Sequence, residues 1–166
     1  TQVEKMLLDV RSSDECEKFV ATAEEKFGRL DVLINAAGIL TLEGVESVED
    51  KNLKDIFETN VAGTIFCTRA AVRAMKKQGS GCIINIASRA AVDRYPAGLS
   101  VYTASKAAVI GFTGCLRKEL DGINIDIFVV SPYFIKDTLL YRFVKEDAKA
   151  VAKQRIVAEA VMDPMS

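Results

Sequence analysis

The chain has 166 residues, a length that suits one domain with its own core and leaves little room for a second. Its 22 Lys and Arg and 23 Asp and Glu are mixed, so no basic segment indicates nucleic-acid binding. No apolar run reaches the roughly 18 residues of a membrane span and no signal peptide opens the chain, so we expect a cytoplasmic protein. The four cysteines are scattered and histidine is absent, which excludes zinc-site spacing.

The first predicted elements are a strand at residues 3–10 and the helix that follows it. Asp9 stands at the end of the apolar run of this strand. Ser12 and Glu15 have capping-box spacing, apolar residues then recur at helical spacing, and Gly28 ends the helix.

A second strand is predicted at residues 31–34, where Val, Leu and Ile run into Asn35-Ala-Ala-Gly38. Small residues at a strand end let a ligand approach the backbone closely, which larger side chains would prevent. Taken alone, the same pattern also fits an ordinary turn from a strand to a loop.

A long helix is predicted at residues 51–78, because apolar side chains recur there at helical spacing. Asn60 interrupts this apolar stripe. A polar side chain on a buried helix face needs hydrogen-bond partners, so Asn60 is either a satisfied core residue or part of a functional site.

The most informative segment joins a strand at residues 82–87 to a helix at residues 100–120. The strand ends at Ser88, and helical spacing places Tyr102 and Lys106 on one face of the helix. A phenol beside an ammonium group can act as an acid near neutral pH, because a positive charge lowers the tyrosine pKa from about 10. A hydroxyl group at the strand end is well placed to hold a substrate oxygen.

The last predicted elements are a strand at residues 123–130, the turn Ser131-Pro132 and a charged helical segment at residues 137–162. Alternating strands and helices predict an α/β fold, here a Rossmann-like parallel sheet with flanking helices, incomplete at about four strands. Dinucleotide-binding folds hold the pyrophosphate at a Gly-rich turn before a helix, and the sequence has no such turn.

Four motifs follow one another in the chain: Asn35-Ala-Ala-Gly38, Asn60, Ser88 and Tyr102-x-x-x-Lys106. Together they resemble the short-chain dehydrogenase/reductase family over about residues 3–138. The resemblance implies NAD or NADP as cofactor and a catalytic set made of Asn60, Ser88, Tyr102 and Lys106. It also implies cofactor contacts at Asp9, Val10, Asn35, Ala36, Gly38, Tyr102, Lys106, Pro132 and Ile135.

The resemblance assigns a role to each catalytic residue in the interconversion of a secondary alcohol and a carbonyl compound. Tyr102 would exchange the proton, and Lys106 would lower the Tyr102 pKa and bind the nicotinamide ribose. Ser88 would hydrogen-bond the substrate oxygen, and Asn60 would support a proton relay through a water molecule. Asp9 would reach the adenine ring, but it fits equally well as the start of a turn.

Three positions depart from the family's pattern. Ala36 replaces the second Asn of its Asn-Asn-Ala-Gly turn, which keeps the turn chemistry. Tyr133 stands where the family has Gly after Pro132, and Asp137 stands where a Thr contacts the carboxamide. The last two departures affect the geometry expected around the cofactor.

By resemblance, the chain begins at the family's third strand and ends shortly after the sixth. We therefore expect the strands near residues 31–35, 82–88 and 123–130 to pair as neighbours. The strand at residues 3–9 either takes the vacant place beside residues 31–35 or lies loose. The chain holds half a cofactor site if it is complete, and it is otherwise one piece of a longer protein.

Two functions follow for residues 1–166 as a single, partial dinucleotide-binding domain. The first is an NAD(P)-dependent oxidoreductase acting on a small-molecule alcohol or carbonyl substrate. The second is a truncated, inactive relative that acts as an interaction or oligomerisation module. We expect a homodimer or homotetramer formed through the helices at residues 51–78 and 100–120.

Overall fold

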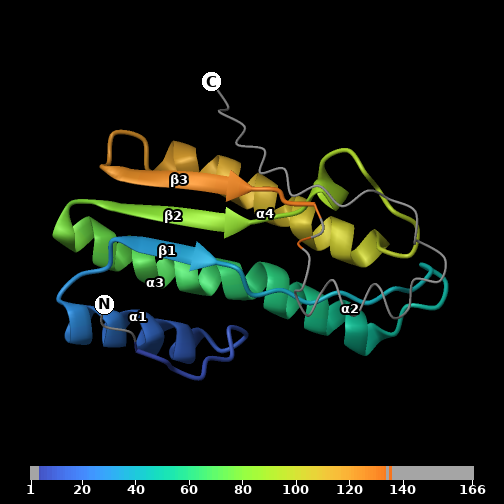
Figure 1. Ribbon diagram of the computed structural model, residues 1–166, viewed down its shortest axis with the longest axis horizontal. Coiled ribbons are helices and arrows are strands. Elements are labelled where there is room, and N and C mark those ends of the chain that lie inside the picture. The colour runs from blue at the N-terminus through green and yellow to red at the C-terminus, as the bar shows by residue number, and fades with distance from the viewer. Residues whose placement is uncertain (1–3, 134, 136–166) are drawn as a thin grey trace.

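The strands of this protein form one parallel sheet with its long helices on one face (Figure 1). The computed structural model describes residues 4–133 and 135. The strands are β1 (Val32–Asn35), β2 (Gly81–Ile86) and β3 (Ile125–Val130), and they pair in the order β1-β2-β3. The predicted α/β, Rossmann-like fold class and the pairing of these three strands as neighbours are confirmed.

The sheet of the described residues has three strands, whereas we expected about four. Residues 4–9 form no strand. The backbone N–H of Asp9 donates to the Glu15 carboxylate at 2.8 Å, and the Asp9 carbonyl accepts from the Ser12 N–H at 3.0 Å. Because local turn bonds hold the end of this segment, the prediction of a strand there is wrong, and the segment lies apart from the sheet.

The first and the last helix of the described residues begin and end close to their predicted positions. α1 (Ser13–Phe27) is capped by Ser12, whose Oγ accepts from the Glu15 N–H, and it ends at Gly28 with a φ of 79°. In a capping box the Glu15 carboxylate would accept from the Ser12 N–H. Here it accepts from the Asp9 N–H instead. α4 (Ser100–Glu119) carries Tyr102 and Lys106 in its first two turns.

The long helix predicted at residues 51–78 is interrupted by one wider turn. It consists of α2 (Asp50–Phe57), a π-helical turn (Glu58–Ala62) and α3 (Gly63–Gln78). The π-helical turn contains Asn60. Such turns occur often at functional sites, because they break the regular pairing of the backbone.

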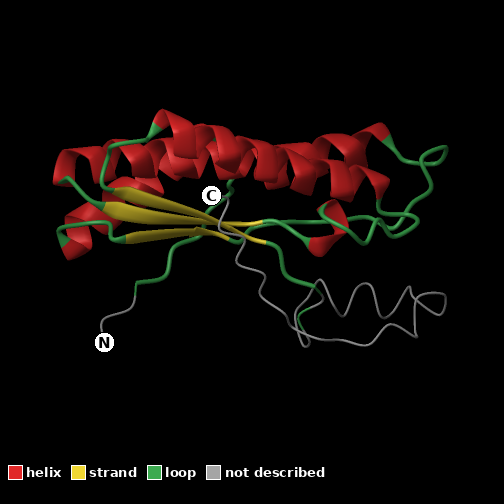
Figure 2. Ribbon diagram, turned by 90° about the horizontal axis from the view of Figure 1, so that it is seen from above, coloured by secondary structure: helices red, strands yellow, loops and turns green. Residues whose placement is uncertain are grey.

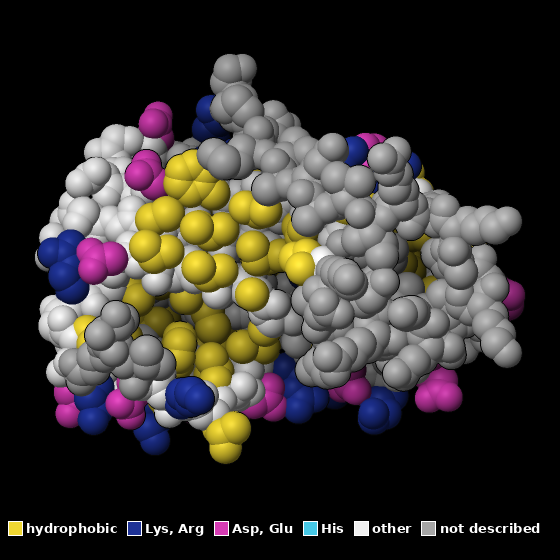
Figure 3. Space-filling model, in the orientation of Figure 1, with side chains coloured by type: hydrophobic (Ala, Val, Ile, Leu, Met, Phe, Trp, Pro, Cys, Tyr) yellow, Lys and Arg dark blue, Asp and Glu magenta, His cyan; other side chains and the backbone are white. Residues whose placement is uncertain are grey.

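The core lies between the sheet and the helices α3 and α4, which Figure 2 shows on the same side of the strands. The sheet residues on that side are buried: Leu33, Ile83 and Ile127. On the other side, Val32, Ile34 and Phe128 are 48%, 57% and 39% exposed, and Figure 3 shows an apolar patch over the strands. Parallel sheets are usually covered on both faces, so the described residues leave one face of this sheet open.

In the described part of the chain, we find no helix with the length and apolar character needed to cross a membrane. The helical segment predicted at residues 137–162, which includes Asp137, lies outside the described residues.

Candidate active site

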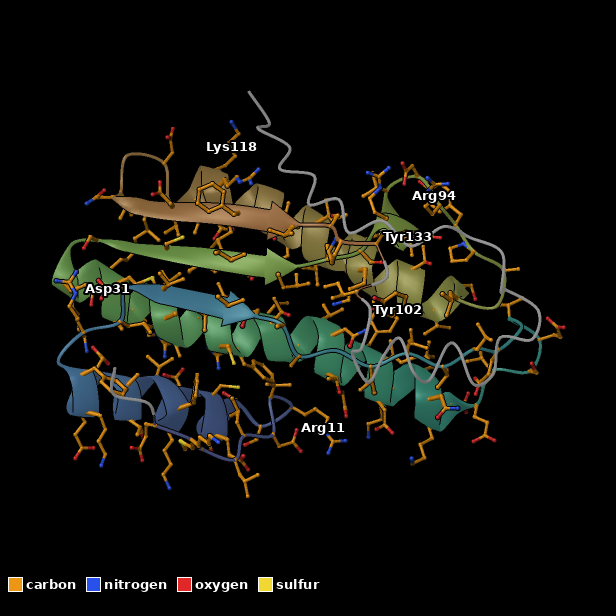
Figure 4. All side chains as sticks on the ribbon, viewed as in Figure 1. Arg11, Asp31, Arg94, Tyr102, Lys118 and Tyr133 are labelled. Atoms are coloured by element: carbon orange, nitrogen blue, oxygen red, sulfur yellow. The ribbon has the colours of Figure 1, made fainter. Side chains whose placement is uncertain are left out.

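The candidate active site lies where the carboxyl ends of the strands meet the first turns of α4. β1 leads into the turn of Ala36 to Gly38, and β2 leads to Ser88. Figure 4 shows Tyr102 on α4 at this end of the sheet. Ligands of open α/β sheets bind beyond the carboxyl ends of the strands, so the sheet brings the predicted residues to the expected edge.

Lys106 is a buried lysine at the centre of this site. Only 5% of its surface is exposed, and its Nζ donates a hydrogen bond to the carbonyl of Ile86 at 2.8 Å. A Cβ atom on Gly38 would lie 3.2 Å from that Nζ, so the glycine allows the turn to approach the ammonium group. Burial disfavours the charged form and lowers the pKa of Lys106 to about 8.

The Tyr102 phenol is also buried, at 6% exposure, and the Lys106 Nζ lies 5.9 Å from the centre of its ring. Burial raises the pKa of Tyr102, and a hydrogen bond with the Ser88 side chain lowers it in part. The phenol is therefore protonated at neutral pH. We expected Lys106 to lower this pKa, but in the structure the group that opposes the effect of burial is Ser88.

Ser88 begins a 3₁₀ turn at Arg89–Ala91. Its Oγ accepts a hydrogen bond from the Ala90 N–H at 3.2 Å, which fixes the hydroxyl at the end of β2. Its proton stays available for donation, because this bond uses only the oxygen as an acceptor.

The titration of Lys106 is a first testable prediction. We expect its ammonium group to titrate near pH 8, whereas an unperturbed lysine titrates at 10.5. Between these values the unfolded chain holds a proton that the folded chain has released, so the contribution of Lys106 to stability rises with pH across that window. ¹³C NMR of the lysine side chains reports this pKa, with Lys106→Met identifying the signal. A Lys106 signal that titrates near pH 10.5 would contradict the effect of burial.

Asn60 is fully buried and joins the turn after β1 to helix α4. Its Oδ1 accepts from the Ile39 N–H at 2.8 Å, and its Nδ2 donates to the Ile39 carbonyl and the Ser105 Oγ, both at 2.9 Å. Ser105 in turn donates to the Tyr102 carbonyl at 2.7 Å. Three hydrogen bonds of the Asn60 side chain thus connect the turn beside Lys106 to α4, the helix that carries Tyr102 and Lys106.

Ser105 is a residue of this site that the sequence analysis missed. It is fully buried and lies one residue before Lys106. The signal was present, because a serine three positions after Tyr102 falls on the same helix face.

Asn35, a predicted cofactor contact, is buried and its side chain takes part in a hydrogen-bond network. Its Nδ2 donates to the Thr68 Oγ1 at 2.9 Å and to the Asn85 Oδ1 at 2.8 Å, and Asn85 donates to Thr113 at 3.0 Å. This buried network, also missed in the sequence, ties the sheet to α3 and α4. The exposed groups of the turn are those of Ala36, Ala37 and Gly38.

Val10 packs against Gly63, the first residue of α3, and Asp9 precedes it in the chain. The exposed Asp9 carboxylate pairs with Arg11 at 2.7 Å, and its hydrogen bonds with Arg11 lower the pKa of Asp9 to about 2. Val10 packs so closely on Gly63 that a Cβ atom there would lie 2.7 Å from the Val10 Cγ2. This close packing holds Val10 against the first turn of α3.

The segment after β3 packs beside the loop that follows Ser88. The Pro132 carbonyl accepts from the Arg89 N–H at 3.0 Å, and Ile135 is 49% exposed. Tyr133, which replaces the family's Gly, has its ring 5.7 Å from the Arg94 guanidinium, and Figure 4 shows the two side by side near Tyr102.

These residues fit one part of a dinucleotide cofactor. The turn of small residues beside Lys106 suits the approach of a ribose, because Ala36, Ala37 and Gly38 are exposed and have little or no side chain to keep a ligand from the backbone. Within the described residues, no Gly-rich turn lies between a strand and a helix, so this part of the chain contains no pyrophosphate cradle of that kind. The same part of the chain has no group of three or more His, Cys, Asp or Glu that could hold a metal ion.

The parallel sheet with its flanking helices is a Rossmann-type α/β domain, and a buried tyrosine and a buried lysine lie at the carboxyl end of its strands. The family model for the short chain dehydrogenase matches residues 1–149. The chain therefore belongs to the short-chain dehydrogenase/reductase family, whose members are NAD(P)-dependent oxidoreductases.

This chain matches only part of the length of each similar protein. A 3-oxoacyl-[acyl-carrier-protein] reductase of Synechocystis is 38% identical over 127 residues, which cover 76% of this chain and 51% of the relative. A 3-oxoacyl-[acyl-carrier-protein] reductase of Thermotoga maritima is 34% identical over 155 residues, which cover 93% of this chain and 62% of the relative. The chain thus spans about half to two thirds of these relatives.

Solved structures of similar proteins share the fold of most of this chain. A short-chain dehydrogenase from Streptomyces avermitilis matches with a TM-score of 0.75 and 32% identity, covering 82% of this chain and 50% of that one. The enzyme ElxO with NADP bound matches with a TM-score of 0.77 and 32% identity, covering 84% of this chain and 56% of that one.

Proposed function

We propose that this chain carries the acid–base site of an NAD(P)-dependent oxidoreductase that interconverts a secondary alcohol and a carbonyl compound. The observation that supports this proposal is the buried Tyr102 phenol, hydrogen-bonded with Ser88 and followed one turn later by the buried Lys106. A protonated phenol next to a fixed hydroxyl matches what a carbonyl oxygen needs as it gains a proton.

A nicotinamide cofactor, when bound here, would supply the hydride that reduces the carbonyl carbon. Tyr102 donates its phenolic proton to the carbonyl oxygen, which Ser88 holds by donating a second hydrogen bond. The ammonium group of Lys106 then stabilises the phenolate that remains, because a nearby positive charge favours the ionised form of tyrosine. In the direction of oxidation, the phenolate takes the proton of the alcohol back.

Asn60 acts in this proposal through position. By bonding to Ile39 and Ser105, it holds the turn that ends at Gly38 against α4, the helix that carries Tyr102 and Lys106. Asp9, Val10, Pro132 and Ile135 are proposed to line the outer parts of the cofactor site.

The relatives suggest the first cofactor and substrate to test. ElxO has been solved with NADP bound, and two relatives are named 3-oxoacyl-[acyl-carrier-protein] reductases. We therefore propose NADPH as the first cofactor, with NADH as its comparison, and a 3-oxoacyl thioester as the first carbonyl substrate.

Cofactor binding is the direct test of this function. We expect the 166-residue polypeptide to bind NADPH or NADH saturably, and Lys106→Ala to weaken binding at least tenfold, because the ribose loses its charged partner. Titration followed by cofactor fluorescence measures both affinities.

Lys118→Ala is the matched control, because Lys118 is an exposed lysine near the other end of α4 (Figure 4). It should leave the affinity unchanged. A folded polypeptide that binds neither cofactor at millimolar concentration would overturn the enzyme proposal for this chain.

The open face of the sheet supports a second candidate function, an inactive module that acts through protein contacts. Val32, Ile34 and Phe128 present an apolar surface there, and large apolar patches often mark interaction sites.

Light scattering tests the homodimer or homotetramer proposed through α2, α3 and α4, and a monomer would contradict it. The cytoplasmic location stays a prediction.

A further inference from the structure

Two cysteines from different helices meet in the core behind the candidate site. Cys16 in α1 and Cys67 in α3 are 51 residues apart in the chain, and their sulfur atoms lie 3.3 Å apart. Both are free thiols, with exposures of 0% and 3%. The oxidoreductase mechanism uses neither of them.

The thiols form a short hydrogen-bonded chain that ends at the backbone of Val10. Cys67 donates to the Cys16 Sγ, and Cys16 donates to the Val10 carbonyl at 3.4 Å. Val10 itself packs against Gly63, at the start of α3. The pair therefore lies directly beneath the segment of Asp9 and Val10.

We propose that Cys16 and Cys67 are an oxidisable pair that forms a disulfide between α1 and α3 when the protein meets hydrogen peroxide. A disulfide has an S–S distance of about 2.05 Å, so the two sulfur atoms need to approach by only about 1 Å. Within the described residues, the other two cysteines, Cys82 and Cys115, lie on β2 and on α4 and have no cysteine partner.

The reaction balances with one molecule of hydrogen peroxide. One thiolate attacks the O–O bond, an S–O bond forms, and the departing hydroxide takes a proton to become water. The second sulfur then attacks the sulfenic sulfur, so that the S–S bond forms, the S–O bond breaks and a second water leaves. Two thiols are oxidised and the peroxide is reduced.

Burial of Cys16 and Cys67 limits the rate at which peroxide oxidises them. Desolvation raises the pKa of both thiols, that of Cys67 to about 12, so little thiolate is present at neutral pH. We therefore expect oxidation to be slow compared with that of an exposed thiol such as Cys115. Once formed, the disulfide has no S–H to donate, so the Val10 carbonyl loses its partner and α1 is fixed to α3.

The test uses the full polypeptide with Cys82→Ser and Cys115→Ser, so that only the proposed pair can react. Treatment with hydrogen peroxide should remove about two hydrogen masses from the folded protein, and a thiol reductant should restore them. Peptide mapping should find Cys16 joined to Cys67. The thermal unfolding temperature should rise on oxidation, because the crosslink restricts the unfolded chain.

Adding Cys67→Ala to this background is the matched control, and it should abolish the loss of mass. Peptide mapping of the oxidised wild-type chain repeats the test if the serine background folds poorly. Two results would overturn the proposal: thiols that stay reduced in the folded protein while they pair in urea, or oxygen added to Cys16 or Cys67 with no crosslink. None of these readouts depends on cofactor binding, so they are independent of the proposed enzyme function.

Discussion

Replacement of Tyr102 by phenylalanine is expected to lower the turnover of a 3-oxoacyl thioester by about a hundredfold to ten-thousandfold, the usual range for removal of a general acid. The substitution removes the phenolic oxygen and keeps the ring. That ring is buried with Leu40, Ala90 and Leu99, so Tyr102→Phe should leave the packing of α4 intact. The loss should therefore fall on proton transfer and not on folding.

Turnover is measured by the disappearance of NADPH, and cofactor affinity by fluorescence in the same samples. We expect the affinity to change by less than about threefold, because the proposed ribose contact belongs to Lys106. Tyr95→Phe is the matched control. Tyr95 is 68% exposed and its hydroxyl donates to the Val92 carbonyl, so turnover should be unchanged. A Tyr102→Phe variant with half the original turnover would show that another group supplies the proton.

The local signals in the sequence identify most of the elements correctly. Ser12 and Gly28 mark the ends of α1 because capping and a positive φ depend on a few neighbouring residues. The Asn35-Ala-Ala-Gly38 turn, Ser88 and Lys106 are brought to one edge because parallel strands end together. These predictions needed only short-range chemistry and the alternation of strands with helices.

The predictions that failed depend on distant neighbours. The apolar run before Asp9 fits a strand, but whether such a run joins a sheet depends on how its side chains pack against a distant strand, which the run itself does not specify. The pKa of Tyr102 also depends on the packing around it. Spacing places Lys106 near the phenol, but it does not show that burial raises the Tyr102 pKa or that Ser88 is the hydrogen-bond partner that lowers it.

Asn60 shows what a sequence leaves open and a structure can decide. From the sequence, it was either a satisfied core residue or part of a relay. The structure shows its side chain satisfied by Ile39 and Ser105, both in segments that carry the site. Because its partners belong to the turn beside Lys106 and to α4, the proposed positioning role of Asn60 would act through the same hydrogen bonds that satisfy its buried side chain.

Asn60→Ala is expected to reduce the free energy of unfolding by about 3 kcal/mol. The substitution removes three hydrogen bonds and leaves the Ile39 N–H and carbonyl without their partner, next to a small cavity. Urea unfolding followed by circular dichroism measures this loss. Asn124→Ala is the control, since Asn124 is exposed and makes one long bond of 3.3 Å to the Gly79 carbonyl, and it should change stability by less than about 0.5 kcal/mol.

The Asn60→Ala variant also distinguishes a positioning role of Asn60 from a role in proton transfer. If Asn60 acts only by positioning, the NMR titration of Lys106 in the folded Asn60→Ala variant should shift towards an ordinary lysine pKa, because the loosened turn at Gly38 admits water to the ammonium group. Turnover per folded molecule should then fall together with that shift. An unchanged Lys106 titration with a large loss of turnover would instead indicate that Asn60 takes part in proton transfer. Stability unchanged to within about 0.5 kcal/mol would contradict both roles, because the hydrogen bonds on which they rest would carry no energy.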